Sequence, residues 1–249
     1  MRKAMVFVLL LGLSGLCFAE QTKTDVDERL QSAAKVLDAV INAPDHGIPN
    51  TVLTGAKCVA VVPSMIKGGF IFGGRHGRGV ATCRLPNGHW SAPSFFTVTG
   101  GSWGAQIGVE DVQLVMMIMN DEGMRHLTND KFQIGGEVSA SAGPIGREAS
   151  AATSWKMNTE ILTYSRAKGL FAGADLGGTQ VERDGDSTKA FYGKDLKTET
   201  VLDGKVPPPP AAHVFLAAVA RSKGEAVAHK EVKKEEKNAK KEANSDQQQ

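Results

Sequence analysis

The side chains most able to do chemistry are basic and lie in a stretch without acidic residues. From His46 to Val109, 64 residues contain neither Asp nor Glu. Arginine presents a planar fork that fits phosphate or carboxylate, and histidine adds positive charge when the pH falls below its pKa. This stretch therefore predicts an anion-binding site, with a phosphorylated head group as its first candidate ligand. The predicted binding residues are Lys67, Arg75, His76, Arg78 and Arg84.

Glycine is dense in the same stretch, which reads KGGFIFGGRHGRGV from Lys67 to Val80. Glycine adopts positive φ at little cost, and successive backbone N–H groups in such turns form concavities that bind anions. The same composition is also typical of tight hairpin turns with solvated tips. The glycines therefore leave two interpretations open, an anion-binding loop and a plain hairpin turn.

Three aromatic residues accompany these cations and are candidates for membrane contact. Phe70 and Phe72 are two residues apart, which places them on one face of an expected strand. They could insert beside a head group or line the core. Trp103 lies in the glycine-rich run GGSWGAQ, and its ring suits the boundary between apolar and wet regions. A buried Trp with a bonded N–H fits this position equally well.

The net charge of the chain is +2, but it is unevenly distributed. Arg2 and Lys3 contribute two positive charges, and residues 221–249 carry eight basic and six acidic side chains. The body between these ends, residues 20–220, therefore sums to −2. A general nucleic-acid binder normally has a strongly basic domain, so we expect no nucleic-acid partner. The local positive charge favours one particular anionic ligand or surface.

Other chemistries find little support in the sequence. Cys58 and Cys83 lie in apolar, strand-like runs, where a disulfide and two buried free thiols fit equally well. Metal ligation lacks suitably spaced partners, and the run DGDS at residues 184–187 lacks the ligand pattern of a calcium loop and is interpreted as an exposed turn. The chain contains no GxSxG, HExxH, CxxC or P-loop pattern. We therefore expect no metal, no cofactor and no enzymatic activity.

Both ends of the chain differ from the body. A basic pair followed by an apolar run, with CFA at residues 17–19, predicts a signal peptide over residues 1–19 and export to the periplasm or outer cell envelope. Lipidation at Cys17 is the alternative, although Leu16 stands where a small residue is usual. Residues 224–249 mix Lys and Glu with almost no apolar side chain, which predicts a charged, disordered tail.

The elements that position the basic residues are predicted to be mostly strands. Apolar residues at three- and four-residue steps predict an amphipathic helix over residues 24–42, with Thr24 as its N-cap. From residue 50 to 205, short runs of β-branched and aromatic residues are bounded by Gly, Pro and Asn, and hairpin-type turns favour antiparallel pairing. The expected strands are residues 56–62, 70–73, 79–85, 94–99, 112–120, 132–140, 161–165 and 170–176.

Two further helices complete the predicted domain, residues 20–223. One covers residues 121–129 with Asp121 as its N-cap, and the other is a docking helix at residues 211–222 after a stiff run of four prolines. Many short strands with a few helices indicate the α+β class. We expect a mainly antiparallel or partly closed, barrel-like sheet packed with the N-terminal helix and two or three short helices. The apolar stripe of the docking helix consists of Val214, Phe215, Ala218 and Val219.

Six blocks in order resemble the SYLF-domain lipid-binding family, whose fungal members also bind actin. The resemblance runs from about residue 27 to 220. It implies a module that binds phospholipids, with phosphoinositides the known class in animal members, and no enzymatic activity. The blocks are AKCVAVVPSMIKGGFIFGGRHGRGVATCR (56–84), HWSAPSFFTVTGGSWGAQIG (89–108), VMMIMNDEG (115–123), GGEVSASAGPIGR (135–147), EILTYSRAKGLFAGADLGG (160–178) and FYG (191–193).

Together, the residues and the resemblance favour an exported module that recognises anionic phospholipid head groups at a membrane surface through the basic, glycine-rich patch. The protein would be peripheral to the membrane. The alternative is a structural or adaptor protein of the cell envelope, with a protein or cell-wall partner reached through the charged tail at residues 224–249.

Overall fold

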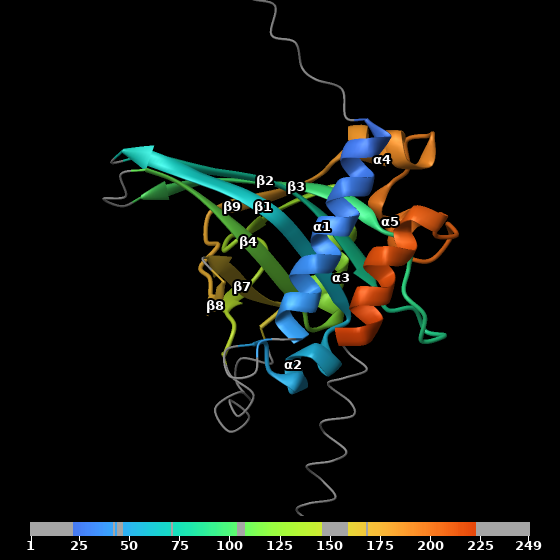
Figure 1. Cartoon of the computed structure of the whole chain (residues 1–249), viewed down its shortest axis with the longest axis horizontal. Coiled ribbons are helices and arrows are strands. Elements are labelled where there is room, and N and C mark those ends of the chain that lie inside the picture. The colour runs from blue at the N-terminus through green and yellow to red at the C-terminus, as the bar shows by residue number, and fades with distance from the viewer. Residues whose placement is uncertain are drawn as a thin grey trace, which may run out of the picture.

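The computed structural model describes residues 22–41, 43, 47–70, 72–103, 108–145, 159–167 and 169–222 (Figure 1). The predicted signal peptide, Cys17 and the charged tail lie outside these residues, so their predictions stay as they are. Within the described part, nine strands form one sheet in the order β5-β9-β3-β2-β1-β4-β7-β6, and β8 pairs with β7. Every strand pair is antiparallel except β6 with β7.

The strands are β1 Cys58–Phe70, β2 Phe72–Cys83, β3 Ser94–Trp103, β4 Gly108–Ile118, β5 Lys131–Ile134, β6 Ala140–Ala142, β7 Ile161–Ala167, β8 Leu170–Gly173 and β9 Thr179–Arg183. The helices are α1 Lys23–Ile41, α2 Asn50–Gly55, α3 Asp121–Thr128, α4 Gly185–Tyr192 and α5 Thr198–Leu202. A 3-10 turn at Pro210–Ala212 leads into a helix at residues 213–222.

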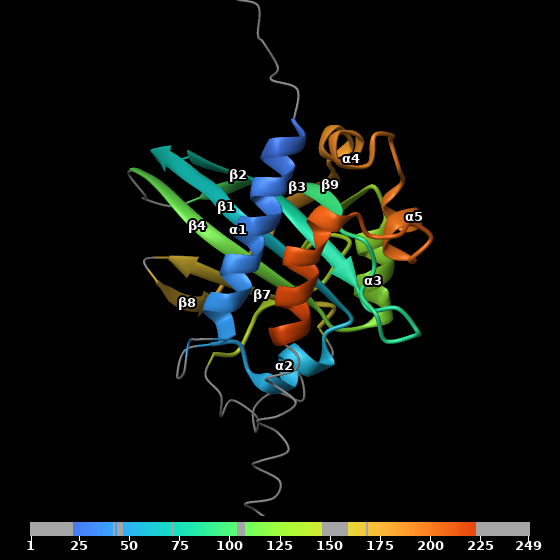
Figure 2. The ribbon, with the colours of Figure 1, turned by 45° about the vertical axis from the view of Figure 1, so that its right-hand side comes forward.

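The sheet has two apolar cores because successive side chains of a strand point to opposite faces. The outer face is covered by α1 and the helix at residues 213–222, which cross it side by side (Figure 2). The helix α4 adds Phe191 to the same core. The inner face encloses the second core, and α3 and α5 contribute Leu127 and Leu202 at one end of it. The predicted α+β class, with a partly closed, barrel-like sheet, an N-terminal helix and short helices, is confirmed.

One end of the sheet extends beyond the covering helices (Figure 1). We call this extension the sheet arm; it consists of residues 64–70, 72–78, 97–103 and 108–111, which belong to β1, β2, β3 and β4. The arm holds most of the predicted anion-binding residues. It lies at the end of the sheet opposite to α3, which follows directly after β4.

The glycines of the arm and of β2 are in extended backbone, contrary to the prediction of a positive-φ loop. The described glycines with positive φ are elsewhere, and none lies between residues 67 and 80. These glycines instead make room for neighbours. A Cβ at Gly79 would lie 2.3 Å from Cζ of Phe96, and one at Gly77 would lie 2.6 Å from Cγ1 of Val62. Close packing inside the barrel therefore explains these two glycines. The strand predicted at 70–73 is divided between two strands, because Phe70 ends β1 and Phe72 begins β2, and β2 continues into the strand predicted at 79–85.

Several helix ends and turns also differ from the predictions. Thr22, not Thr24, exchanges hydrogen bonds with Asp25 at the start of α1. The side chain of Asn120, not Asp121, caps α3 by accepting from the N–H of Gly123 at 2.9 Å. In both cases the residue just before the observed helix supplies the cap, because the cap has non-helical backbone while the first helical residues do not.

Three further predictions need correction. The strand expected at 132–140 is broken at Gly135, whose φ of 83° turns the chain between β5 and β6. Asp184 is not in an exposed turn; it is buried and caps α4, accepting from the N–H of Ser187. In the docking helix, Phe215, Ala218 and Val219 are buried, but Val214 is 42% exposed because it lies off the stripe that faces the sheet. No helix among the described residues is both long and apolar enough to span a bilayer.

Candidate anion-binding site

The register of the sheet arm divides the five predicted basic residues among three places. Lys67 of β1 lies directly opposite Arg75 of β2. Both point to the inner face, because Met65 and Ala81, in step with them along the two strands, belong to the inner core. His76 and Arg78 therefore point to the outer face. Arg84 follows β2 at its other end, about 30 Å along the strand from Arg75 at the usual rise per residue.

Lys67 and Arg75 belong to a row of residues that crosses five strands on the inner face. Glu110 of β4 pairs with Lys67, Gly100 of β3 pairs with Arg75, and Thr179 of β9 pairs with Gly100. We call these five residues the inner row. The row lies at the end of the inner face that is farthest from α3 and α5, where the sheet arm begins.

Arg75 is held in place by neutral groups. Its Nη1 donates to the backbone oxygen of Asp175 at 3.1 Å, and its Nη2 donates to the backbone oxygen of Gly101 at 3.2 Å. Its Nε is buried and has no hydrogen-bond partner among the described residues. Carbonyl oxygens orient the guanidinium but carry no net charge, so its positive charge is not cancelled by these contacts.

Lys67 is a half-buried cation beside Arg75. Burial lowers the pKa of Lys67 below its ordinary value, the neighbouring charge of Arg75 lowers it further, and Glu110 acts in the opposite direction. The charged ammonium is therefore less favourable here than in water. An anion placed between Lys67 and Arg75 would favour the charged form again.

Thr179 completes the row from a strand that the sequence did not predict. Its side chain is fully buried, and its Oγ1 has no hydrogen-bond partner among the described residues. Gly100 lies between Thr179 and Arg75. A Cβ at Gly100 would lie 3.2 Å from Oγ1 of Thr179 and 3.4 Å from Cγ of Arg75. The glycine therefore lets these two side chains pack close to the backbone of β3.

The outer-face cation Arg78 is engaged in a structural contact. Its Nε lies 3.8 Å from Oδ2 of Asp184. The same oxygen is 3.3 Å from Nη1 of Arg29 and accepts from Oγ of Ser187 at 2.6 Å. Asp184 thus offsets part of the charge of Arg78, although the arginine side chain stays partly exposed.

His76 lies beside an exposed apolar pair on the same outer face. It pairs with Ile66 of β1, and Gly68 two residues along pairs with Val109 of β4. Ile66 and Val109 are 46% and 78% exposed. They are diagonal neighbours across β1 and β4, a separation of about 7–8 Å. The arm therefore carries Lys67, Arg75 and Glu110 on its inner face. Its outer face carries exposed apolar side chains among charged and polar ones, since Ile66 pairs with Asp111 on its other side.

The three predicted aromatic residues come together at the tip of the arm as far as the backbone shows. Phe70 pairs with Phe72, and Phe72 pairs with Trp103. Their side chains lie outside the described part of the chain, so the predicted membrane contact remains a prediction. Arg84 is exposed at the opposite end, where its N–H donates to the backbone oxygen of Lys57.

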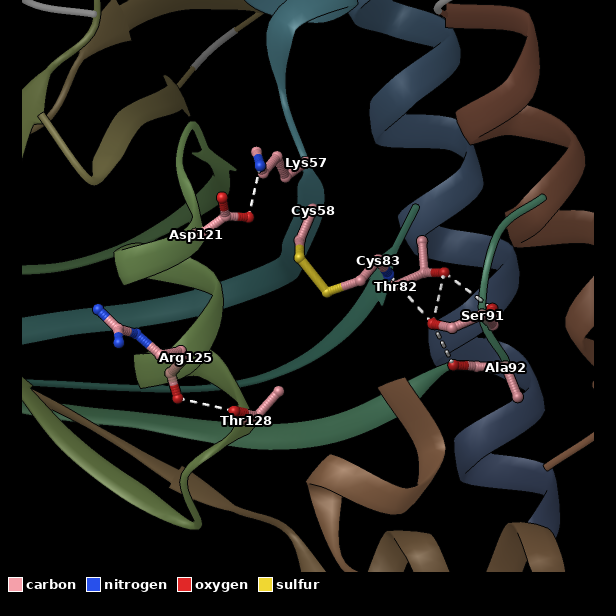
Figure 3. The surroundings of a disulfide bond; sticks show 9 residues. All are labelled: Lys57, Cys58, Thr82, Cys83, Ser91, Ala92, Asp121, Arg125 and Thr128. Atoms are coloured by element: carbon pink, nitrogen blue, oxygen red, sulfur yellow. Dashed lines mark hydrogen bonds and ion pairs between the residues drawn. A yellow bond between two sulfur atoms is a disulfide. The ribbon is translucent and has the colours of Figure 1, made fainter. Parts of the chain in front are cut away.

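Cys58 and Cys83 are joined by a disulfide at the base of the β1–β2 hairpin (Figure 3). Both residues are buried in the inner core. Nearby, Oγ1 of Thr82 donates to the backbone oxygen of Ser91, and Oγ of Ser91 accepts from the N–H of Cys83. The disulfide therefore fixes the end of the hairpin opposite to the sheet arm. In the described part of the chain, His, Cys, Asp and Glu form no group of three that could hold a metal ion.

Sequence reasoning missed Glu110, Gly100 and Thr179 as members of the row. Pro63 could have indicated on which face of β1 Lys67 lies. It lies where the register of β1 shifts against both of its neighbours, which marks a β-bulge. Proline inside a strand pattern indicates such a bulge, and an extra residue exchanges the two faces of the strand beyond it. Lys67 therefore points inward, although strict alternation from the base of β1 would point it outward.

Comparison with known proteins found a matching family profile and several relatives. The profile of the Ysc84 family, described as Las17-binding protein actin regulator, matches residues 99–222. The chain is 37% identical over 194 residues to Protein YSC84 of Saccharomyces cerevisiae, covering 75% of this chain and 41% of that protein. It is 35% identical over 189 residues to LAS seventeen-binding protein 3 of the same species, covering 73% of this chain and 41% of that protein.

A mammalian relative shows a similar degree of identity. SH3 domain-containing YSC84-like protein 1 of Homo sapiens is 31% identical over 195 residues, which cover 76% of this chain and 57% of that protein. The chain therefore spans about half the length of the relatives it matches.

Proposed function

The chain belongs to the Ysc84 family of SYLF-domain proteins, and from that premise we propose that it is a module that binds anionic phospholipid head groups at a membrane surface, without catalysis. LAS seventeen-binding protein 3 and the family profile are described by what they bind or regulate, not by a reaction. The resemblance of the sequence blocks to the family supports the proposal of lipid binding, and the geometry of the inner row supports an anionic ligand.

The observation that carries the proposal is the direct pairing of Lys67 with Arg75 on the inner face of the sheet arm. Among the described residues, Arg75 donates only to backbone carbonyls, and burial disfavours the charged form of Lys67. A phosphate would stabilise the two adjacent positive charges, because it supplies negative charge and hydrogen-bond acceptors together. Glu110 beside Lys67 offsets only one of the two charges.

The outer face of the same arm supports contact with a bilayer. Ile66 and Val109 expose apolar surface next to His76. An arm that enters the interface would place these side chains against lipid while the inner face meets head groups. Lysine and arginine stems can also cover apolar surface while their charged ends stay near phosphate.

The place of action is part of the proposal. The signal-peptide pattern at residues 1–19 supports export. The disulfide between Cys58 and Cys83 fits an oxidising compartment, where such bonds persist. We place the protein in the periplasm or outer cell envelope, peripheral to the membrane.

Vesicle co-sedimentation tests the proposed function. Protein from residue 20 onward is mixed with phosphatidylcholine vesicles, with or without phosphatidylglycerol, at low and moderate salt. We expect binding that requires phosphatidylglycerol and weakens with salt, because exposed charge attraction is screened within about 8–10 Å. The double substitution Lys67→Gln and Arg75→Gln should weaken binding at least about tenfold, as for the loss of one charged hydrogen bond.

Two control variants separate the cations of the arm. Arg84→Gln removes one basic residue at the far end of β2 and should leave binding unchanged. His76→Gln with Arg78→Gln tests the outer face. Equal binding by wild type to both kinds of vesicle, or to neither, would contradict the proposal. Melting curves of each variant establish that the fold is kept.

A protein partner is the second candidate function, and the names of the relatives favour it. One relative is a LAS seventeen-binding protein, and the family profile is described as an actin regulator. Here the partner would be an envelope protein or cell-wall component reached through residues 224–249. If deletion of these residues abolishes retention on isolated envelopes while vesicle binding is absent in the intact protein, the adaptor function is favoured.

A further inference from the structure

We propose that the inner row contains a phosphate subsite in which Nε of Arg75 and Oγ1 of Thr179 donate to one phosphate group above Gly100. The inference rests on the proposed function and deepens it, because it names the ligand chemistry and the residues that receive it. The ligand class is a phosphate ester, and either a lipid head group or a free phosphate could supply it.

Thr179 differs from the other buried threonines of the sheet. Oγ1 of Thr82 donates to the backbone oxygen of Ser91 at 2.8 Å, and Oγ1 of Thr163 donates to that of Ser141 at 3.1 Å. Oγ1 of Thr179 has no partner among the described residues, although its side chain is fully buried. A buried hydroxyl without a partner is unfavourable. An acceptor oxygen of a ligand at this position would supply the missing hydrogen bond.

Arg75 offers the second unpartnered donor. Its two terminal nitrogens are fixed by the backbone oxygens of Asp175 and Gly101. Nε is the guanidinium nitrogen that is buried and has no protein partner within the described residues. Because the guanidinium is planar, fixing two nitrogens also fixes the direction in which Nε points.

Gly100 brings the two donors to one space. It pairs with Arg75 on one side and with Thr179 on the other. Its φ is not positive, so the backbone does not require glycine here. A Cβ would crowd Oγ1 of Thr179 at 3.2 Å and Cγ of Arg75 at 3.4 Å. It would also lie 3.2 Å from Cα of Thr179, so glycine at this position lets Thr179 and Arg75 approach the same point of the sheet.

Lys67 adds charge to the subsite from the neighbouring strand. It lies opposite Arg75, and the row continues to Glu110 on its other side. The carboxylate of Glu110 repels an anion at that end. A phosphate is therefore directed toward the Arg75 and Thr179 end, where Nε and Oγ1 lack partners among the described residues. The backbone oxygens of Asp175 and Gly101 at this end already accept from the guanidinium.

The test uses two substitutions and their matched controls in otherwise complete protein. Thr179→Val removes the hydroxyl with little change of shape, and Gly100→Ala fills the space. Thr99→Val and Gly101→Ala are the controls: Thr99 is the neighbour of Gly100 on the opposite face, and a Cβ at Gly101 would meet nothing within 4 Å. Because Oγ1 of Thr179 has no partner within the described part of the chain, Thr179→Val should melt no lower than wild type.

Binding is measured with phosphatidylcholine vesicles doped with phosphatidic acid, and by calorimetry with inorganic phosphate and with short-chain, monomeric phosphatidic acid. We expect Thr179→Val and Gly100→Ala each to weaken phosphatidic acid binding about tenfold, as for the loss of one hydrogen bond to a charged group, and the controls to bind like wild type. Tighter binding of the short-chain lipid than of inorganic phosphate identifies a head group as the source; equal binding identifies free phosphate.

The failures of the two proposals are distinguishable. If wild type and both variants bind the vesicles equally, the subsite is wrong and the lipid-binding function stands. If wild type binds no vesicle, the proposed function is wrong. Binding of inorganic phosphate that depends on Thr179 would then still support the subsite, with free phosphate as its ligand.

Discussion

At the residue scale, several basic side chains of the stretch without acidic residues lie next to acidic side chains from other parts of the chain. Lys67 faces Glu110, Arg78 faces Asp184, and Lys57 forms an ion pair with Asp121. Each acidic partner comes from outside the stretch. Arg75 differs because its contacts are neutral backbone oxygens. The difference among these cations lies in their partners, and it makes the Lys67 and Arg75 pair the best candidate for an anion.

The lowered pKa of Lys67 predicts a pH-dependent affinity. The free site binds a proton at Lys67 less readily than an ordinary lysine of pKa 10.5. A bound anion favours the charged form, so binding is coupled to proton uptake and weakens as the pH rises through the lowered pKa toward 10.5. We expect the affinity for phosphatidylglycerol vesicles to fall over this interval.

Phosphatidylglycerol is the suitable probe because its phosphodiester does not titrate in this range. Lys67→Arg keeps the charge at these pH values, so this variant should lose much less affinity over the same interval. An identical pH profile for wild type and Lys67→Arg would exclude Lys67 as the titrating group. The free energy of unfolding depends on pH in the opposite direction. Burial of the charged ammonium of Lys67 lowers stability at low pH, and this cost is relieved as the pH rises through the lowered pKa.

At the element scale, the β1–β2 hairpin is specified by close packing over its glycines and by its bulge. The ring of Phe96 occupies the position of the missing side chain at Gly79, and Val62 does so at Gly77. The disulfide fixes the base of the hairpin, and the bulge at Pro63 reverses the faces of β1 before the arm. Together these features place Lys67 opposite Arg75 on the inner face.

Substitution of Gly79 tests this packing. In Gly79→Ala the new methyl group would lie 2.3 Å from Cζ of Phe96, so the ring must move. We expect the free energy of unfolding to fall by about 1–3 kcal/mol, as for other overpacked cores. Gly74→Ala on the same strand is the control, because its Cβ would meet only the backbone oxygen of Gly100, at 4.0 Å.

Chemical denaturation measures both glycine variants. The Gly74 variant should be neutral or slightly stabilised, since alanine restricts the unfolded chain more than glycine. Equal stability of the two variants would show that packing against Phe96 does not explain the glycine at position 79.

At the scale of the whole molecule, one carboxylate joins the outer helices to the sheet. Asp184 caps α4 and contacts Arg29 of α1 and Arg78 of β2. Arg29 is buried, and burial lowers its pKa while Asp184 opposes that effect. The guanidinium also lies over the ring of Phe95, 5.8 Å from its centroid. The attachment of α1 to the sheet thus depends on a compensated buried charge.

Removal of that compensation should be strongly destabilising. Asp184→Asn keeps the size of the side chain but leaves Arg29 buried with less opposing charge. We expect a loss of about 3–5 kcal/mol in the free energy of unfolding, as for other buried ion pairs that lose one partner. The exposed Asp186→Asn in the same helix is the control and should change stability by less than about 0.5 kcal/mol. A similar small effect for Asp184→Asn would mean that Arg29 is adequately solvated without it.

The sequence by itself determined the class of the fold and the family. Short runs of β-branched and aromatic residues such as 56–62 and 94–99 indicated strands. The stripe from Val26 to Val40 indicated the N-terminal helix, and six blocks carried the resemblance. These patterns involve residues that are close together in the sequence, so they can be detected without the structure. Cap positions were displaced by one or two residues, because the cap depends on backbone angles at a single residue.

Only the tertiary structure decided which of the five basic residues meet and what neutralises them. The pairing of Lys67 with Arg75, and of Gly100 with Thr179, follows from strand register across segments far apart in the chain. The bulge at Pro63 changes the face of Lys67, and the short strand β9 supplies Thr179 from about 80 residues away along the chain. Register and burial are properties of the closed sheet, because each strand is positioned by its neighbours and not by its own sequence.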